Sequence, residues 1–452
     1  MSERGAVLRH AGTVLAGQLA VMAFGVTDTI VAGRHSEGAL AALSIGSAVF
    51  ISVYVSLMGV LQALLPVWAE QRGAQAQGAM GASVRQSLYL CLALTALGMA
   101  VLLTPGALLR WTQVPEALRG EVQQYLHILA FALPPALLFR IYSTLNQSLG
   151  HPQLVTWLQV GSLGLKIPLS ITLAFGAFGL PAQGATGCAW ATLVVNYALL
   201  AVAVWMLRSR SMYAPIALWR RLERPDFAHL AHFAWLGIPA GLSILVEVTS
   251  FSLVALFVAR QGTLASASHQ IASNLAAVFY MVPLSLAIAT SARVSFWRGA
   301  GDEDRARALA WMGFRLAALA GIALAAILLI ARQPIAALYS SNMQVALAAA
   351  AILPWVAGYH MADALQTVCI FVLRSYRVTI APLVVYCVLL WGGGLAGGYW
   401  LVYHGMGSWQ PKASPAPFWA TSAAALAVTA AVFTAMLARV LRRSAPAATA
   451  AP

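Results

Sequence analysis

Charged residues are scarce in this 452-residue chain: Asp, Glu, Lys and Arg make up 9% of it, while 61% is hydrophobic. A water-soluble chain of this length would need many more charges to cover its surface. Apolar runs of about 20 residues predict helices that cross roughly 30 Å of hydrocarbon. Because these runs are too long and continuous for barrel strands, helices rather than strands are expected to satisfy the backbone in lipid. The sequence therefore predicts an all-α polytopic membrane protein.

Acidic residues are especially few, 13 against 27 Lys and Arg, which gives a formal net charge of +14. The excess does not form a basic stripe with interleaved aromatics, so no nucleic-acid partner is expected. Instead the arginines gather in alternate loops, about 19 of them on one side and about six on the other. This bias predicts a multi-pass protein of the bacterial inner (plasma) membrane with both termini in the cytoplasm. The lipid bilayer is its expected surrounding, and no obligate protein partner is indicated.

Cysteine is also rare, and several catalytic motifs are missing. Each of the four cysteines lies in an apolar run and none forms a Cys-x-x-Cys pair, so neither a disulfide nor a metal is predicted. His360 and Asp363 have a metal-like spacing but lack a third ligand. The chain contains no Gly-x-Ser-x-Gly elbow, no His-Glu-x-x-His and no nucleotide-binding P-loop. We therefore expect neither an enzyme nor a cofactor.

The apolar runs predict twelve transmembrane helices. They lie near 10–33, 41–66, 84–109, 122–149, 153–178, 184–207, 229–259, 266–293, 308–331, 345–373, 379–403 and 417–440. The longest polar stretch, 208–228, carries five arginines and separates six helices from six. The predicted organisation is an N-terminal six-helix lobe (1–207), a cytoplasmic linker (208–228) and a C-terminal six-helix lobe (229–452).

Two short sequence echoes indicate that the halves are copies. Arg72–Ala74 follows the second predicted helix, and the same three residues return as Arg298–Ala300, 226 positions later. Trp190–Thr192 opens the sixth helix and returns as Trp419–Thr421, 229 positions later. Because each half holds an even number of helices, the copies share one orientation, as in transporters built from parallel repeats.

Three carboxylates lie inside predicted membrane helices: Asp28, Glu247 and Asp363. A charge at mid-bilayer costs on the order of 2.5–3.5 kcal/mol or more, so an intramembrane acid is a functional hypothesis by default. The alternative is an acid that a neighbouring helix neutralises and that serves packing.

Oxygen-bearing side chains share helix faces with two of these acids. The two sets are Ser243, Glu247 and Ser250 in the seventh helix, and Tyr359, Asp363, Gln366 and Thr367 in the tenth. Oxygen atoms around a carboxylate suit Na⁺, whereas desolvation of the acid favours a proton; both ions stay open, with the oxygen-rich faces favouring Na⁺. The Ser and Thr side chains could instead form interhelical hydrogen bonds.

Motifs in both halves resemble the multidrug and toxic compound extrusion (MATE) family, in particular its NorM-type bacterial members. The resemblance covers about residues 8–440. Its carriers are Gly25–Gly33, Gly184–Thr192, Leu245–Phe251, Phe279–Pro283, Ala362–Gln366 and Leu373–Tyr376.

The resemblance implies two six-helix lobes in a V, with a central cavity and alternating access. It also implies export of cationic, amphipathic, drug-like compounds in exchange for Na⁺ or H⁺. The family's coupling ion would lie in the second lobe, at Glu247 and Asp363 with Tyr280 beside them. The acid of the first lobe matches Asp28.

The fifth helix departs from the family pattern. Where relatives read Asn-Ile-Pro-Leu-Asn, this chain has Lys166 and Ser170 at the two asparagine positions. One hypothesis is that Lys166 pairs with Asp28 as a fixed internal cation and removes the first lobe as an ion site. The other is that Lys166 extends to the cytoplasmic headgroups.

A flippase or exporter for a lipid-linked precursor or a dedicated metabolite is the alternative function. A flippase for anionic headgroups needs several cavity cations, and only Arg140 and Lys166 are candidates here. The sequence does not name the exported compound or the oligomeric state.

Overall fold

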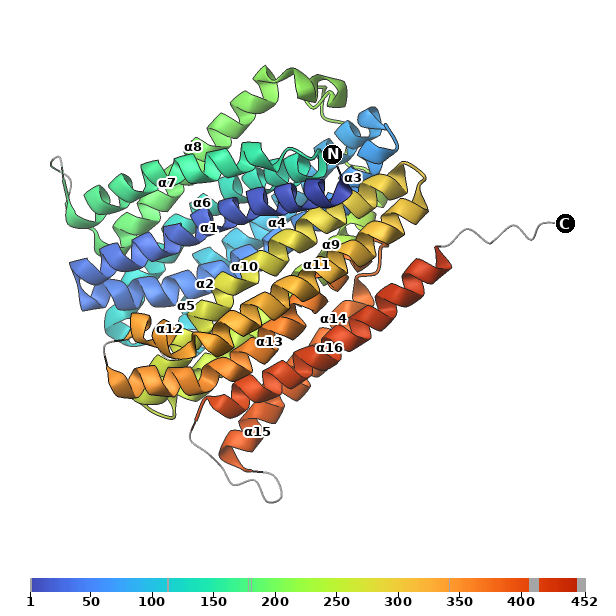
Figure 1. Ribbon diagram of the computed structural model, residues 1–452. Coiled ribbons are helices and arrows are strands. Elements are labelled where there is room, and N and C mark those ends of the chain that lie inside the picture. The colour runs from blue at the N-terminus through green and yellow to red at the C-terminus, as the bar shows by residue number, and fades with distance from the viewer. Residues whose placement is uncertain are drawn as a thin grey trace. The chain divides into compact units, whose positions relative to one another are not determined.

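Helices account for the regular secondary structure in the computed structural model, which describes residues 2–111, 114–177, 179, 181–340, 342–405 and 414–444 (Figure 1). The first half holds α1 (Glu3–His35), α2 (Glu37–Gln62), α3 (Leu65–Gly73), α4 (Gln77–Leu103), α5 (Gly106–Trp111), α6 (Glu116–Ser148), α7 (Pro152–Phe175), α8 (Gly184–Ser209) and the 3₁₀ helix η1 (Ser211–Ile216). The second half holds α9 (Phe227–Ala259), α10 (Thr263–Gly299), α11 (Glu303–Ile330), α12 (Arg332–Tyr339), α13 (Met343–Ser375), α14 (Ile380–Tyr386), the π-helix η2 (Cys387–Ala396), α15 (Gly397–Tyr403) and α16 (Ala416–Arg443).

Twelve helical segments of the described chain are long and apolar enough to cross a membrane. Two of them are composite: α2 and α3 form one segment over Glu37–Gly73, and α14, η2 and α15 form another over Ile380–Tyr403. The short helices α5 and α12 lie between segments. The prediction of an all-α protein with twelve membrane helices is therefore confirmed. Residue 178 of the predicted helix 153–178 lies outside the described residues, as do parts of the predicted lobes 1–207 and 229–452.

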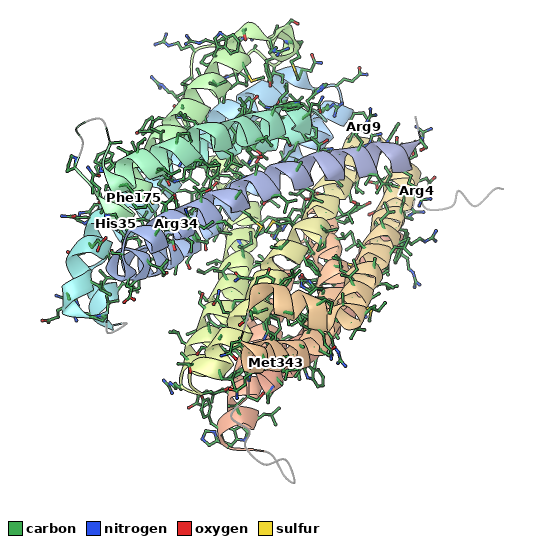
Figure 2. The ribbon with its side chains drawn as sticks, turned by 60° about the vertical axis from the view of Figure 1, so that its left-hand side comes forward. Arg4, Arg9, Arg34, His35, Phe175 and Met343 are labelled. Atoms are coloured by element: carbon green, nitrogen blue, oxygen red, sulfur yellow. The ribbon has the colours of Figure 1, made fainter. Side chains whose placement is uncertain are left out.

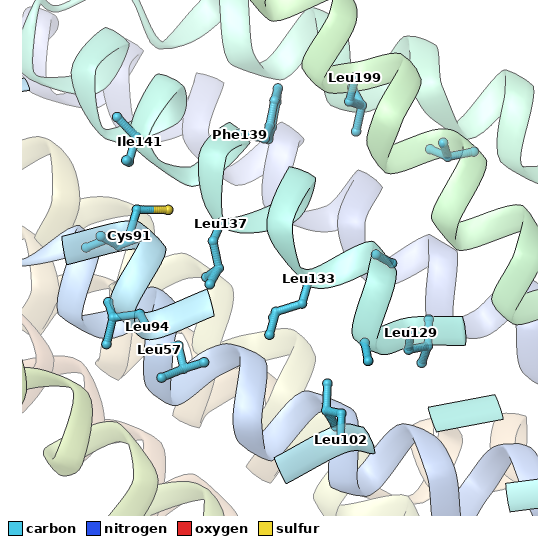
Figure 3. Close-up of a cluster of buried hydrophobic side chains, with 14 of the residues drawn as sticks. Leu57, Cys91, Leu94, Leu102, Leu129, Leu133, Leu137, Phe139, Ile141 and Leu199 are labelled. Atoms are coloured by element: carbon cyan, nitrogen blue, oxygen red, sulfur yellow. The ribbon is translucent and has the colours of Figure 1, made fainter. Parts of the chain in front are cut away.

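The chain divides into two compact units, and the first in sequence comprises Thr13–Gly241. In it α6 packs against α2, α4 and α8, and α7 packs against α8. Figure 3 shows the apolar contacts that hold α6 in place, with Leu133 and Leu137 close to Leu57, Cys91 and Leu94. We call this part of the chain the first unit.

The second unit comprises Leu242–Pro452 together with Met1–Gly12. Here α13, the tenth membrane segment, packs against α10, α11, α12 and α16. Helix α13 is therefore the central helix of the second unit, as α6, the fourth membrane segment, is of the first.

The unit boundaries lie inside α1 and α9, which differs from the predicted lobes 1–207 and 229–452. Contacts of the helix ends account for the difference. Glu3 accepts hydrogen bonds from the Arg293 guanidinium and from the Trp297 indole, which joins the start of α1 to α10. At Gly241 a Cβ would lie 2.5 Å from the Ser56 carbonyl oxygen, so glycine allows the first part of α9 to approach α2 closely.

The repeated arginines make equivalent contacts in the two units. Arg72 donates from Nη1 to the Ser148 carbonyl at the end of α6, over 3.2 Å. Arg298 donates from Nη1 to the Ser375 carbonyl at the end of α13. Carbonyls at a helix C-terminus lack intrahelical donors and carry partial negative charge, so each guanidinium completes a helix end. The matching contacts support the duplication inferred from the sequence.

The segment between α8 and α9 is docked on α4. Arg85 donates from Nε to the Glu223 carboxylate over 2.8 Å and from Nη1 to the Ala217 carbonyl over 2.7 Å. The hydrogen bond from Arg85 lowers the pKa of Glu223 from 4.5 to about 2. Tyr89 and Gln86 add hydrogen bonds to the backbone at Glu223 and Arg224. The predicted linker 208–228 is thus an ordered part of the first unit.

Candidate functional site

The first unit holds Asp28 in a closed ion pair. Along the chain direction, α1 lies beside α7: the Thr156 hydroxyl donates to the Thr13 carbonyl over 2.7 Å, and the rings of His35 and Phe175 lie together at the other end (Figure 2). Between these two contacts, Asp28 of α1 faces the polar side of α7. Helix packing therefore places a lysine of α7 opposite this acid.

Lys166 satisfies all three of its N–H donors within the protein. Its Nζ lies 2.8 Å from Asp28 Oδ1, 2.7 Å from the Thr192 hydroxyl and 3.1 Å from the Cys188 carbonyl. The Ser170 hydroxyl donates to the same Asp28 oxygen over 2.9 Å. Lys166 is 0% exposed, so its ammonium group lies inside the unit and does not extend to the headgroups. The structure thus contains the ion pair of the first hypothesis.

Arg140 of α6 is a second buried cation in this unit. Its side chain is 6% exposed, and its Nε and Nη2 atoms have no hydrogen-bond partner among the described residues. Tyr54 of α2 lies near enough to interact with it electrostatically.

The second unit brings the two other membrane acids together. Glu247 of α9 and Asp363 of α13 interact electrostatically, and Tyr280 of α10 interacts with both. Asp363 is 1% exposed, whereas Glu247 is only partly buried. Arg374, near the end of α13, is buried and interacts with Glu247. Two neighbouring acids with one basic residue beside Glu247 form a group that can take up a cation or a proton.

Hydrogen bonds fix one oxygen of Asp363. Its Oδ1 accepts from Gln366 Nε2 over 2.8 Å and from the Thr367 hydroxyl over 3.4 Å. Tyr386 of α14 donates to Gln366 Oε1, which sets the orientation of the amide. The other oxygen, Oδ2, has no hydrogen-bond partner in the described part of the chain and lies 3.8 Å from His360 Nδ1.

A cavity opens beside these acids and lies within the second unit. Its empty volume, including the open side, is about 430 Å³. The cavity is lined by Glu247, Ser250, Phe251, Val254, His269, Tyr359, Leu390, Gly394, Phe418, Trp419, Ser422 and Leu426. One carboxylate among aromatic and aliphatic walls is an environment suited to an organic cation.

The predicted site residues are distributed unevenly around this cavity. Glu247, Ser250 and Tyr359 line it, whereas Asp363, Gln366 and Thr367 are hydrogen-bonded to one another and are not lining residues. Ser243 is buried one turn before Glu247 and is not a lining residue. Lys166, Ser170 and Asp28 belong to the first unit.

Several side chains of the site were not predicted from the sequence: Trp419, His269, Tyr386 and Arg374. Trp419 carried a signal, because it belongs to the repeated Trp-Ala-Thr motif, but the repeat does not tell which copy faces a cavity. Its counterpart Trp190 is 43% exposed, whereas Trp419 is 3% exposed. Arg374 follows directly on an apolar run, where the sequence alone does not distinguish a buried arginine from a loop arginine.

Comparison with known proteins gives consistent matches over nearly the whole chain. The family model MatE matches residues 14–172 and 239–400. The chain is 38% identical to the "Probable multidrug resistance protein NorM" of Aromatoleum aromaticum, over 97% of this chain and 95% of the relative. It is 32% identical to the "Multidrug resistance protein PmpM" of Pseudomonas aeruginosa, over 97% of this chain and 91% of the relative.

Solved structures share the fold. The eukaryotic MATE transporter AtDTX14 superposes with a TM-score of 0.86 at 19% identity, and 98% of each chain is covered. The Vibrio cholerae MATE transporter VcmN in its bent form gives a TM-score of 0.83 at 17% identity, again with 98% of each chain covered. With the family model matched in both halves of the chain, this protein belongs to the MatE family, the multidrug and toxic compound extrusion transporters.

Proposed function

We propose that this protein is a secondary active multidrug transporter that exports amphipathic organic cations in exchange for Na⁺ or H⁺. The observation that carries the proposal is the cavity of the second unit, where Glu247 is set among aromatic side chains. The names of the relatives, multidrug resistance proteins, support the same substrate class. Family membership supports alternating access as the mechanism of transport.

Recognition of the substrate would rest on two attractions. Phe251, Tyr359 and Trp419 present aromatic rings to the cavity, and a ring face attracts a cation by about 0.5–2 kcal/mol depending on how far it is desolvated. The Glu247 carboxylate supplies the opposite charge. Flat, apolar cations satisfy both attractions.

Coupling would arise because the same acid serves the substrate and the ion. Glu247, Asp363 and Tyr280 form the proposed ion site, supported by Gln366 and Thr367. A Na⁺ ion or a proton bound there removes the negative charge that holds the organic cation. Ion entry would therefore favour release of the substrate, and substrate entry would favour release of the ion.

The first unit would not carry a coupling ion. Asp28 already has a cation, because Lys166 Nζ lies 2.8 Å from its Oδ1. We propose that this lysine is a permanent replacement for the ion, which leaves one coupling site per molecule, in the second unit.

The protein would lie in the bacterial inner membrane with both termini in the cytoplasm. The arginine distribution supports this orientation. A fluorescent reporter that matures only in the cytoplasm, fused to the C-terminal end, tests it. No cofactor and no enzymatic activity are expected, since the proposed work draws on an ion gradient.

Flipping of a lipid-linked diphosphate is less well supported. Such a headgroup carries several negative charges, and Lys166 is neutralised by Asp28. Among the described residues this leaves Arg140, whose Nε and Nη2 have no hydrogen-bond partner there, and one guanidinium is a weak match for a diphosphate.

The direct test is ethidium efflux from intact cells that express the protein, with either a Na⁺ gradient or a pH gradient imposed alone. We expect efflux with one of the two gradients, which identifies the ion, and loss of that efflux in Glu247→Gln and Asp363→Asn. Glu116→Gln, which changes an exposed acid at the start of α6, is the matched control. Undiminished efflux in both site variants would remove these acids from the coupling role.

A further inference from the structure

Three aromatic rings form one wall of the cavity in the second unit. Phe251 of α9, Tyr359 of α13 and Trp419 of α16 contact one another edge to face. Their centroids are 5.7 Å apart for Phe251 and Tyr359, 5.9 Å for Phe251 and Trp419, and 5.6 Å for Tyr359 and Trp419. Edge-to-face contact fixes each ring by its neighbours, so a rotation of one ring disturbs the whole wall.

One polar contact sets the orientation of the largest ring. Trp419 donates from Nε1 to His269 Nδ1 over 3.2 Å, and both side chains are 3% exposed. The other imidazole nitrogen, Nε2, lies 3.2 Å from the Ser273 hydroxyl. The indole therefore has a partner on α10 that holds it in the cavity wall.

This contact determines the protonation state of the histidine. An indole N–H only donates, so Nδ1 must offer its lone pair. His269 is consequently neutral, with its proton on Nε2, and can donate to Ser273. An imidazolium would carry N–H groups on both nitrogens, and its Nδ1–H would oppose the indole N–H.

We infer that His269 is a positioning residue that holds Trp419 in the substrate-binding wall only while the imidazole is neutral. Protonation of His269 removes the acceptor at Nδ1, releases the indole and lowers the affinity of the cavity for an organic cation. A positive charge placed beside the cavity also repels the substrate. The inference rests on the proposed function, because it takes the cavity as the substrate site.

Among the described residues, α13 packs on α10 and carries His360, Asp363 and Arg374, none of which lines the cavity with His269. Glu247 from α9 and Tyr359 from α13 line the same cavity. Among the helices that pack on α10 and α13, α16 has its charged residues in its last turns, from Arg439 onward, and α11 has them between Glu303 and Arg315. Arg315 is exposed. Since Glu247 is present in every variant below, a difference between their pH profiles reports on His269.

The decisive experiment compares His269→Asn with His269→Leu. The Asn amide oxygen can accept from the indole at any pH, whereas Leu offers no acceptor. The binding of ethidium to purified protein is measured from about pH 8 down to about pH 4, a range wide enough to charge a buried histidine. We expect the parent protein to lose affinity severalfold toward the acidic end, His269→Asn to keep the parent affinity at about pH 8 and lose much less, and His269→Leu to bind weakly throughout.

Trp419→Phe tests the other partner, because it keeps a ring and removes the N–H donor. Its affinity should be lower than that of the parent at about pH 8 and should vary less with pH. His127→Gln, which changes an exposed histidine of α6, controls for the general effect of losing an imidazole. If His269→Asn keeps the full acidic loss, or binds as weakly as His269→Leu at every pH, the inference is wrong. If the parent protein neither binds nor exports ethidium, the proposed function itself has failed.

Discussion

Asp28 and Lys166 show how one lysine changes the chemistry of a buried membrane acid. A buried pair is stabilising only if the remaining donors and acceptors are satisfied, and here Thr192, the Cys188 carbonyl and Ser170 complete it. The pair is electrically neutral without any bound ion.

The pairing predicts a double-mutant result. Lys166→Met leaves a buried carboxylate without a countercharge and should lower the free energy of unfolding by about 3–5 kcal/mol, because an uncompensated charge in the interior is costly. Lys166→Met combined with Asp28→Asn should recover most of the loss. Thermal unfolding of the detergent-purified variants measures this. Equal midpoints for the parent and Lys166→Met would show that the pair contributes nothing.

Residues of the site differ in how far the sequence could reveal them. The acids stood out, because carboxylates in apolar runs are expensive, and the oxygen atoms of Gln366 and Thr367 followed from helical spacing. Trp419 and His269 could not be paired in this way, since they lie on helices 150 residues apart in sequence. An apolar tryptophan in a membrane helix carries no signal of its own, because most such side chains face lipid.

At the scale of elements, the membrane helices were predictable because hydropathy determines them directly. Hydropathy did not predict the irregularities within these helices. The eleventh segment was predicted as one helix over 379–403, and it contains the π-helix η2 with three consecutive glycines, Gly392, Gly393 and Gly394. Trp391 of this π-helix donates to the Val246 carbonyl over 3.2 Å, beside Glu247. Hydropathy does not distinguish an α-helix from a π-helix, so this feature required the structure.

The segment between α8 and α9 was predicted from its arginines as a polar linker, and its contacts with α4 were not foreseen. A polar stretch is predicted to be exposed unless its contacts are known. The residues that contact this segment, Arg85, Gln86 and Tyr89, lie more than 130 residues earlier in the sequence. At Gly81 a Cβ would lie 1.8 Å from the Ile216 carbonyl oxygen, so glycine allows this close approach.

The Arg85–Glu223 pair predicts how this segment responds to substitution and to pH. Glu223→Gln should free the segment and speed tryptic cleavage at Arg220, Arg221 and Arg224 at neutral pH. Because the folded-state pKa of Glu223 is lowered from 4.5 to about 2, its stabilising contribution is fully present above about pH 4.5 and is lost as the pH falls toward about 2.

Pepsin digestion at about pH 4 checks that dependence: the segment of the parent protein should resist cleavage there, since the acid is still ionised in the fold. Protection should decline only as the pH approaches about 2. Glu116→Gln, at an exposed pair with Arg119, is the control. Equal tryptic rates in Glu223→Gln and the parent would contradict the assigned role of the pair.

At the scale of the molecule, the two units share one helix arrangement but differ in the polar groups that they hold. Arg72 and Arg298 retain equivalent contacts, which preserves the architecture of both units. The repeated tryptophans have diverged, with Trp190 exposed and Trp419 in a cavity wall. The first unit holds a buried ion pair, and the second holds two acids beside a cavity. We therefore expect substrate and ion to exchange in the second unit.

Equilibrium binding of ethidium to the purified protein, with Na⁺ concentration and pH varied independently, tests this account most directly. If one ion and the organic cation compete for Glu247, the apparent Kd should rise in proportion to the concentration of one of the two ions, as expected for one competing ion per site. In the His269→Asn background, where the histidine no longer contributes, Glu247→Gln should abolish this dependence. An ethidium affinity that is indifferent to both ions, or a dependence that survives in the double variant, would contradict the exchange of substrate and ion at this acid.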